Sequence, residues 1–389
     1  MPRLKHVLLP SLVSLFLHFS TATATTPGTA TILHGVSGSS SRDVWTFGYS
    51  VPSSGVSDTL AEHWDGSAWS IVPTPSPGTG SAFLNEGLSF SSDDTWVVGD
   101  YDNSTPHEGT GNSLIEHWNG TGWSVVPSPN PGSSGNVLRG IDGVSPTDIW
   151  ANGFQKNGSE DSTLIVHYDG TSWSQVASPN VGTGKNYLSG VAAISSDDVW
   201  SVGSYFVSGG VYRTLAMHWD GETWNVVQTP SPGKGTKYPQ GALLRIAWGT
   251  SSSDVWAVGR YWNGTAFRNL ALHWNGTAWV RVATPNFGTG DNELRRVHGT
   301  GSNDVWAVGY YHDTNVNKDR ALALHWDGTA WSKSPIKSAN GSSYLKGLIA
   351  FSGTNVWAAG YKASSGGLFR SLIERWNGTS WIIISSPNA

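Results

Sequence analysis

The sequence predicts an all-β protein, a seven-bladed β-propeller with four antiparallel strands in each blade. A unit of about 50 residues occurs seven times, and each unit divides into four short segments with strand character. No unit shows the 3.6-residue periodicity of an amphipathic helix. The composition agrees: of 389 residues 22 are Trp, 48 are Gly and 19 are Pro, while only 13% are charged. This composition excludes a coiled coil and a disordered polymer.

Two tryptophan motifs define the repeat. The first is Asp-Val-Trp or a close variant, and its tryptophans are Trp45, Trp96, Trp150, Trp200, Trp256, Trp306 and Trp357. The second, His-Trp-Asp/Asn-Gly-x-x-Trp, alternates with the first and runs from His63 to Trp69 in the first copy. Twenty of the 22 tryptophans occupy repeat positions, with Trp248 and Trp262 as the exceptions. A repeat of this length predicts stacked units with a shared core.

Each unit contains four predicted strands. The first strand opens with a leucine that lies 12 residues before the Asp-Val-Trp tryptophan in all seven units. These leucines are Leu33, Leu84, Leu138, Leu188, Leu244, Leu294 and Leu345. In the fifth unit the other strands are 254–259, 270–274 and 279–282, and Asn275-Gly276 joins the last two. Asn-Gly and Asp-Gly favour the positive φ angles of a tight hairpin turn.

The connector after the fourth strand predicts the radial order of the strands. It is rich in proline, as in residues 127–133, and can carry the chain from the outer edge of one blade to the inner edge of the next. The first strand of each blade is then innermost and the fourth outermost. Because the repeats begin on a first strand and end on a fourth, we expect the ring to close by packing between blades, without an interleaved strand.

These motifs carry a resemblance to known proteins. Asp-Val-Trp-Ala-Val-Gly at 254–259, His-Trp-Asn-Gly-Thr-x-Trp at 273–279 and Pro-Ser-Pro-Asn-x-Gly at 127–132 resemble the tryptophan-rich propeller repeat of secreted bacterial proteins, many of them uncharacterised. The resemblance covers residues 33–388 and is looser to kelch, Asp-box and WD-repeat propellers. The acidic residue directly precedes Gly here, unlike in an Asp-box, and no kelch Gly-Gly doublet recurs. The resemblance implies a fold and no particular ligand.

The first 24 residues have the pattern of an export signal. Arg3 and Lys5 precede an apolar run at 7–19, and residues 22–24 form an Ala-Thr-Ala cleavage site. The run is too short to cross a bilayer as a helix. We therefore expect a signal peptide at 1–24, a single propeller domain at 25–389, a secreted protein and no membrane span.

Charge and cysteine content exclude several classes of function. The chain has no Cys, which excludes disulfide scaffolds, thiolate metal sites and a cysteine nucleophile. Its net charge of −5 argues against nucleic-acid binding, which needs a basic surface. We expect no cofactor, no nucleic-acid partner and a monomer.

An Asp begins the second strand of most units and a His ends the third, and antiparallel pairing brings these ends together. The expected pairs are Asp43 with His63, Asp94 with His117, Asp148 with His167, Asp198 with His218, Asp254 with His273, Asp304 with His325, and Asn355 with Arg375. The joint change to Asn and Arg in the seventh unit is what a hydrogen-bonded pair predicts. We interpret the pairs as structural struts, similar to the Asp–His arrangements of WD-repeat propellers. Equivalent histidines on neighbouring blades should lie on the order of 15 Å apart, too far to share a metal ion.

The connections between second and third strands, and those between blades, vary in length and lie on one face. We expect this face to bind a ligand. Second strands end there in aromatic residues, and our candidate ligand contacts are Tyr205, Tyr261, Trp262 and Tyr311, since aromatic rings beside polar groups suit sugars. Alternatively, these rings only cap the core of each blade.

A second candidate set follows each first-strand leucine by one residue and consists of His34, Asn85, Arg139, Ser189, Arg245, Arg295 and Lys346. Near the mouth of the central channel, Arg139, Arg245, Arg295 and Lys346 would form a partial ring of positive charge that attracts a carboxylate, sulfate or phosphate. Alternatively, they are solvated edges of the inner strands.

The sequence therefore favours a secreted, non-enzymatic module that binds a glycan or a cell-surface protein. One alternative is a structural or adhesive scaffold without a small ligand. Another is a propeller glycoside hydrolase or polysaccharide lyase, for which Glu86 and Asp142 on adjacent blades are the candidate carboxylates. A glycosidase would need these two within about 10 Å of each other, and no motif joins them.

Overall fold

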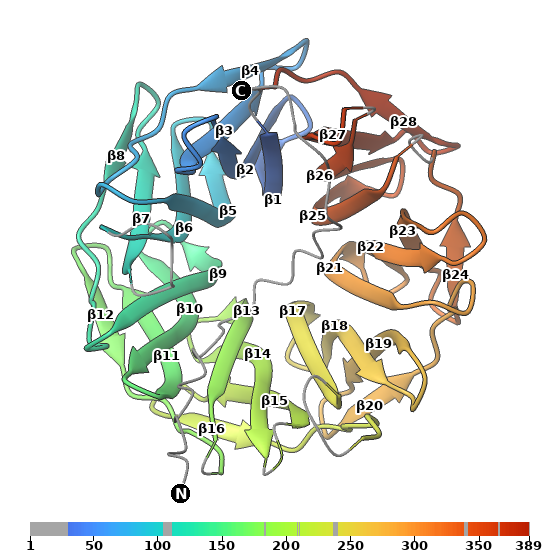
Figure 1. Cartoon of the computed structure of the whole chain (residues 1–389). Coiled ribbons are helices and arrows are strands. Elements are labelled where there is room, and N and C mark those ends of the chain that lie inside the picture. The colour runs from blue at the N-terminus through green and yellow to red at the C-terminus, as the bar shows by residue number, and fades with distance from the viewer. Residues whose placement is uncertain are drawn as a thin grey trace, which may run out of the picture.

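The computed structural model describes residues 30–103, 111–182, 184–207, 209, 211–235, 240–337, 341–364 and 366–388. The export signal expected at 1–24 lies outside these residues. Seven four-stranded sheets surround a common axis, as Figure 1 shows. Each sheet uses four strands consecutive in the chain, all paired antiparallel. The prediction of a seven-bladed propeller is confirmed.

The strands have the following bounds. Blade 1 comprises β1 (Ala30–Ser40), β2 (Asp43–Val51), β3 (Asp58–Trp64) and β4 (Trp69–Val72), and blade 2 comprises β5 (Ala82–Ser91), β6 (Asp94–Tyr101), β7 (Asn112–Trp118) and β8 (Trp123–Val125). Blade 3 comprises β9 (Gly135–Ser145), β10 (Asp148–Asn157), β11 (Glu160–Tyr168) and β12 (Trp173–Val176), and blade 4 comprises β13 (Asn186–Ser195), β14 (Asp198–Val207), β15 (Val211–Trp219) and β16 (Trp224–Val227). Blade 5 comprises β17 (Ala242–Ser251), β18 (Asp254–Trp262), β19 (Phe267–Trp274) and β20 (Trp279–Val282), and blade 6 comprises β21 (Asn292–Gly301), β22 (Asp304–Asp313), β23 (Lys318–Trp326) and β24 (Trp331–Ser334). Blade 7 comprises β25 (Ser343–Ser352), β26 (Asn355–Ala363), β27 (Phe369–Trp376) and β28 (Trp381–Ile384).

The first strand of every blade lies next to the axis and the fourth lies at the rim (Figure 1). Among the described residues no blade takes a strand from another blade, so blades 7 and 1 meet by side-chain packing, as predicted. No helix of the described part of the chain is long and apolar enough to span a membrane.

Tryptophan rings fill the space between blades. Trp45 on β2 is fully buried, and its ring centroid lies 5.1 Å from that of Trp118 and 5.2 Å from that of Trp123 in blade 2. The same second-strand tryptophan meets two aromatic rings of the following blade at each of the other interfaces. Tilted and edge-on aromatic pairs at this spacing are favourable beyond the area they bury. The repeated tryptophans therefore form the cores between blades.

The proline-rich connectors turn back onto the third strand of the blade they leave. In blade 3, Asn180 Oδ1 accepts the backbone N–H of Thr163 at 2.9 Å, and the Thr163 hydroxyl donates to the Pro179 carbonyl at 3.3 Å. Equivalent contacts occur in blades 2 and 7. The Ser-Pro-Asn sequence thus fixes the connector against the third strand in blades 2, 3 and 7.

Candidate functional site

The residue after each first-strand leucine lies in a β-bulge. In blade 1, Leu33 pairs with Gly48 and Gly35 pairs with Phe47, so His34 is left out of the ladder. The same register shift occurs in all seven blades. We call the seven bulge residues the mouth ring: His34, Asn85, Arg139, Ser189, Arg245, Arg295 and Lys346. A bulge re-aims a side chain that the ladder would otherwise fix, and each of these residues is partly exposed.

Three arginines of blades 5 and 6 converge on one carboxylate, and we call this group the arginine cluster. Glu293, with only 1% of its side chain exposed, accepts hydrogen bonds from Arg245 Nε at 2.7 Å and Arg260 Nη1 at 3.0 Å. Arg295 Nε lies 3.2 Å from the same carboxylate, and the Tyr310 hydroxyl donates to it at 3.0 Å. Burial raises the pKa of Glu293, but the guanidinium charges outweigh burial and hold this pKa well below its usual value.

The arginine cluster carries more positive than negative charge. Three guanidinium groups face one carboxylate, which leaves an excess of two positive charges. The side chains of Arg245 and Arg295 are 24% and 25% exposed. The terminal nitrogens of Arg245 have no hydrogen-bonding partner among the described residues. The cluster can therefore offer charged N–H donors to an anion that approaches from solvent.

Arg139, the fourth predicted cation, has different surroundings. Its guanidinium carbon lies 4.7 Å from the ring centroid of Phe154 and 5.9 Å from that of Tyr187. Burial lowers the pKa of Arg139, whereas the nearby Asp100 and Asp161 raise it. The surroundings of Arg139 therefore differ from those of the arginine cluster, where three guanidinium groups share one carboxylate.

Lys346 contacts a histidine rather than a carboxylate. Its Nζ lies 3.0 Å from Nε2 of His34, and Nδ1 of His34 lies 3.5 Å from the side-chain oxygen of Asn85. Burial, reinforced by the charges of Arg295 and Arg245, lowers the pKa of Lys346 well below its usual value. Burial also lowers the pKa of His34 well below its usual value. The permanent charges of the mouth ring are therefore its arginines.

The aromatic residues at the ends of the second strands divide into two sets because side chains alternate along a strand. Tyr205, Tyr261 and Tyr311 lie two residues after the strand glycine and pack, partly buried, against the cores between blades. The Tyr261 hydroxyl accepts a hydrogen bond from Arg281 at 2.6 Å. The ring of Trp262 packs edge-on against Phe267, with centroids 5.2 Å apart. That these four residues contact a ligand stays a prediction.

Three tyrosines outside our four aromatic candidates lie beside the arginine cluster. The Tyr344 ring lies 5.1 Å from that of Tyr310 and 4.8 Å from that of Tyr361. The guanidinium carbon of Arg295 lies 5.8 Å from the Tyr310 centroid, and Lys346 Nζ lies 5.0 Å from that of Tyr361. For Tyr310 and Tyr361 the useful signal was the position directly after the second-strand glycine, whereas Tyr344 precedes the first-strand leucine of blade 7.

The two candidate catalytic carboxylates each have a structural partner. Glu86 on β5 forms an ion pair with Arg296 on β21, so this contact joins blades 2 and 6 on opposite sides of the axis (Figure 1). Asp142 on β9 accepts the backbone N–H groups of Gly143 at 2.9 Å and Ala193 at 3.0 Å, and burial raises its pKa to about 6. The described residues show no hydrogen bond between Glu86 and Asp142.

The predicted strut residues lie within hydrogen-bonding distance in every blade. The six Asp–His pairs span 2.6 to 2.8 Å, from the Asp Oδ1 to the His Nε2. In blade 7, Arg375 Nε donates to Asn355 Oδ1 at 2.9 Å. Each of these histidines also packs on the second-strand tryptophan of its blade. The described part of the chain holds no group of three His, Cys, Asp or Glu residues placed to bind a metal ion.

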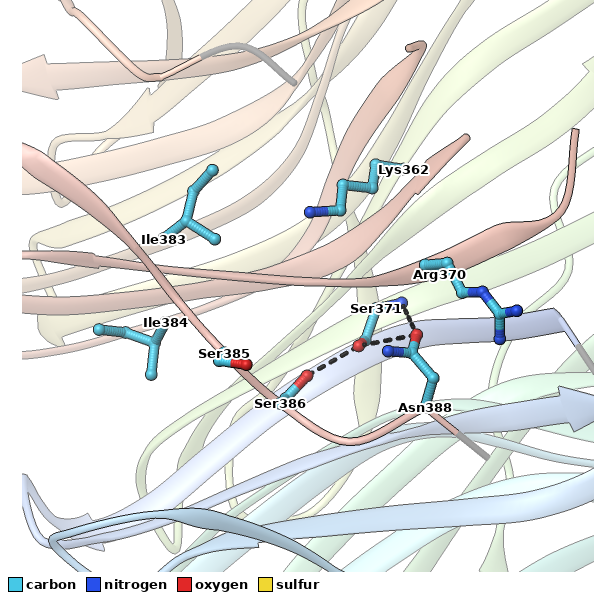
Figure 2. A pocket seen from close by; sticks show the side chains of 8 residues that line it. All are labelled: Lys362, Arg370, Ser371, Ile383, Ile384, Ser385, Ser386 and Asn388. Atoms are coloured by element: carbon cyan, nitrogen blue, oxygen red, sulfur yellow. Dashed lines mark hydrogen bonds between the residues drawn. The ribbon is translucent and has the colours of Figure 1, made fainter. Parts of the chain in front are cut away.

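A separate pocket of about 400 Å³ lies at the outer part of blade 7 (Figure 2). Its lining includes the cationic side chains of Lys362 and Arg370, and Figure 2 shows the two apolar residues Ile383 and Ile384 on its other side. The connector contacts of Ser371 with Ser386 and Asn388 lie within it. The pocket belongs to the rim of the propeller and not to the mouth ring.

Comparison with known proteins supports the fold. No protein-family profile matches the sequence, and a search of curated proteins found no match. Among solved structures, the chain is similar to YCF48 bound to D1 peptide, with 16% identity, a TM-score of 0.50, and coverage of 91% of this chain and 95% of that one. It is also similar to an ulvan lyase of a polysaccharide lyase family bound to -[GlcA(1-4)Rha3S]-, with 9% identity, a TM-score of 0.54, and coverage of 88% and 91%.

A puromycin hydrolase gives a TM-score of 0.57 at 11% identity, with coverage of 92% of this chain and 54% of that one, so this chain spans about half of its length. At these identities the likeness concerns the fold alone. The comparisons therefore support a propeller with tryptophan-rich strands. They do not test the finer resemblance to the repeats of secreted proteins.

Proposed function

We propose that this protein is a non-enzymatic binding module whose ligand is an anionic glycan, held at the arginine cluster of the mouth ring. The observation that carries the proposal is the convergence of Arg245, Arg260 and Arg295 on the single carboxylate of Glu293. Glu293 fixes the positions of the guanidinium groups without neutralising them. An anion with two oxygens can replace water at the remaining N–H donors.

The neighbouring tyrosines favour a sugar as the carrier of the negative charge. Tyr310 and Tyr344 are partly exposed and lie beside Arg295. Aromatic rings pack against the apolar faces of sugars, while convergent polar groups select their orientation. A uronic acid or a sulfated sugar combines both features. The export signal expected at residues 1–24 agrees with a ligand outside the cell.

Binding explains the site better than hydrolysis. Glu86 is paired with Arg296, and Asp142 accepts two backbone N–H groups, so each carboxylate has a structural role. A glycosidase of the usual kind needs one carboxyl group as acid and another as base or nucleophile, placed on either side of the scissile bond.

The proposal is tested by calorimetric titration of the protein with an oligogalacturonate, a sulfated oligosaccharide and a neutral cello-oligosaccharide. We expect binding of an acidic probe that weakens as salt rises, because salt screens exposed charges. Arg245→Gln removes charge-assisted hydrogen bonds, each worth about 1.5–3 kcal/mol, and should weaken binding about tenfold or more.

Arg139→Gln is the matched control, because Arg139 is also a mouth-ring arginine but lies among carboxylates. It should leave the affinity within about twofold, a difference of about 0.4 kcal/mol. Equal loss in both variants, equal affinity for the neutral probe, or no binding of any of the three probes would contradict the proposal.

A further inference from the structure

We propose that the side-chain amine of Lys346 forms a reversible imine with an aldehyde or ketone group of an anionic ligand. The mouth ring would then hold a covalent attachment site beside the arginine cluster. The choice of an anionic carbonyl compound rests on the proposed function, whereas the reactivity of the amine does not. The chemical class is an oxo acid, such as a 2-oxo carboxylate or the open-chain reducing end of a uronic acid.

The contacts of Lys346 distinguish it from an ordinary surface lysine. Its Nζ has no carboxylate partner among the described residues, and its hydrogen-bonding partner is Nε2 of His34 at 3.0 Å. Lys185 provides the contrast, because its Nζ forms an ion pair with Asp161 at 2.9 Å. A paired carboxylate holds a lysine in its charged form, whereas a neutral imidazole does not.

His34 is oriented to accept a proton from Lys346. Its Nδ1 faces the side-chain oxygen of Asn85 at 3.5 Å, which places the ring hydrogen on Nδ1 and the lone pair on Nε2. The amide nitrogen of Asn85 in turn donates to the Leu138 carbonyl at 2.8 Å, and this contact fixes which end of the amide faces His34. The three residues come from blades 7, 1 and 2, and all occupy mouth-ring positions.

The electrostatic surroundings favour the neutral amine. Burial and the positive charges of Arg295 and Arg245 oppose protonation of Lys346 and outweigh the opposite effect of Glu293, so its pKa falls well below the usual value. A lysine that is partly desolvated or placed beside other cations becomes a nucleophile near neutral pH. The same arginines would hold the carboxylate of the ligand, so one set of charges both activates the amine and positions the carbonyl group.

The proposed step is balanced without an oxidant or reductant. The Nζ lone pair attacks the carbonyl carbon, and a proton moves from nitrogen through His34 to the carbonyl oxygen to give a carbinolamine. The C–O bond then breaks, the C=N bond forms, and the second amine proton joins the departing hydroxyl group, so one molecule of water leaves. Hydrolysis reverses each step, so the attachment is reversible.

The test uses the full chain, glyoxylate as an anionic carbonyl probe and propanal as an uncharged one. Cyanoborohydride reduces any imine to a stable secondary amine, and mass spectrometry of proteolytic peptides then gives the extent of modification at each lysine. At pH 7 with glyoxylate, we expect Lys346 to be modified at least about ten times faster than Lys185, which is paired with a carboxylate. Modification that simply follows the exposure of the lysines would overturn the inference.

The two probes separate this inference from the proposed function. A preference for Lys346 with propanal supports the reactive amine by itself. A larger preference with glyoxylate than with propanal supports the arginine cluster as an anion site as well. Equal preference for Lys346 with both probes would support a reactive amine and contradict recruitment of the ligand by the arginines. No preference with either probe would contradict the reactivity of the amine, whatever the glycan titrations show.

Variants identify the residues responsible. Lys346→Arg keeps a long basic side chain but removes the primary amine, and it should abolish modification at this position without raising it elsewhere. His34→Gln removes the proton acceptor and should slow modification of Lys346 several-fold. Ser189→Ala, a mouth-ring substitution in blade 4, is the control and should leave the rate unchanged. An unchanged rate in His34→Gln would contradict the role of His34 as proton acceptor.

Discussion

The ring of Trp357 in the last blade lies 5.3 Å from the ring of Trp64 in the first blade, measured between centroids. It also lies 5.6 Å from Trp69, at an edge-on angle of 77°. Trp45 makes the same two contacts across the interface between blades 1 and 2. The seam between the ends of the repeat array is therefore built like the internal interfaces.

Truncation of the seam tryptophan should destabilise the whole ring. Trp357→Ala leaves a cavity between blades 7 and 1, and removing a buried tryptophan costs about 3–5 kcal/mol. Urea denaturation followed by circular dichroism measures the loss. Ile382→Ala is the control, because this residue is 38% exposed and should cost less than about 1 kcal/mol. A similar loss of stability in both variants would show that the packing of Trp357 between blades 7 and 1 contributes no more than an exposed side chain does.

The protein should be more stable in mild acid than in alkali because of a buried glutamate on β7. Glu116 is fully buried, neither of its carboxylate oxygens has a hydrogen-bonding partner among the described residues, and burial raises its pKa to about 9. Because the pKa of Glu116 is raised in the folded protein, its contribution to the free energy of unfolding is complete below the pKa that it has in the unfolded chain. It is lost as the pH rises through about 9. Thermal melts between pH 5 and pH 9 measure this dependence.

Glu116→Leu should flatten that pH profile. Blades 5 and 6 carry Leu272 and Leu324 at the equivalent position, so the larger apolar side chain fits the same strand. We expect a gain of about 1–3 kcal/mol near pH 8, the usual penalty for an unsatisfied buried polar group, and little gain near pH 5. Glu62 and Glu374 occupy this position in blades 1 and 7 with pKa values of about 8. An unchanged pH profile in the triple variant, in which Glu62, Glu116 and Glu374 all become Leu, would contradict this account.

The Asn355–Arg375 contact should be interchangeable with the Asp–His contact of the other blades. Each single change, Asn355→Asp or Arg375→His, replaces one half of a hydrogen-bonded pair. We expect the double variant to recover stability relative to the sum of the single variants, with a coupling of about 0.5–3 kcal/mol. A double-mutant cycle in urea measures it, and strict additivity would show that the two residues act independently.

The ion pair between Glu86 and Arg296 should act as a brace across the axis. Both residues are more than nine-tenths buried. Removing one partner of a buried pair leaves an uncompensated charge and costs about 3–5 kcal/mol. We expect Glu86→Gln and Arg296→Gln each to destabilise the protein, and the double variant to recover part of the loss, as measured by chemical denaturation. Losses that add in full would contradict the brace.

The fold was predictable because the seven repeats of the sequence can be aligned with one another. The fixed distance of 12 residues between Leu33 and Trp45 recurs in every unit and specifies the first hairpin of each blade. The joint change at Asn355 and Arg375 likewise identifies two residues that touch. Such features depend on repetition along the chain, which a single sequence displays in full.

The candidate site was predictable only in part. The mouth-ring positions follow from their place after the leucine, but their different surroundings do not. Arg245 shares one carboxylate with two other arginines, whereas Arg139 packs on aromatic rings, and this difference depends on side chains from the neighbouring strands and blades. The ion pair of Glu86 with Arg296 joins residues 210 positions apart on opposite blades, and no local pattern indicates it.

The β-bulge after each first-strand leucine has an evolutionary consequence. A residue outside the hydrogen-bonded ladder can change its size or charge without shifting the register of the strands that carry it. The fold provides seven such positions, one in each blade, and their side chains carry imidazole, amide, hydroxyl, guanidinium and amine groups. Selection can therefore change the chemistry of the mouth ring one blade at a time while the architecture is inherited unchanged.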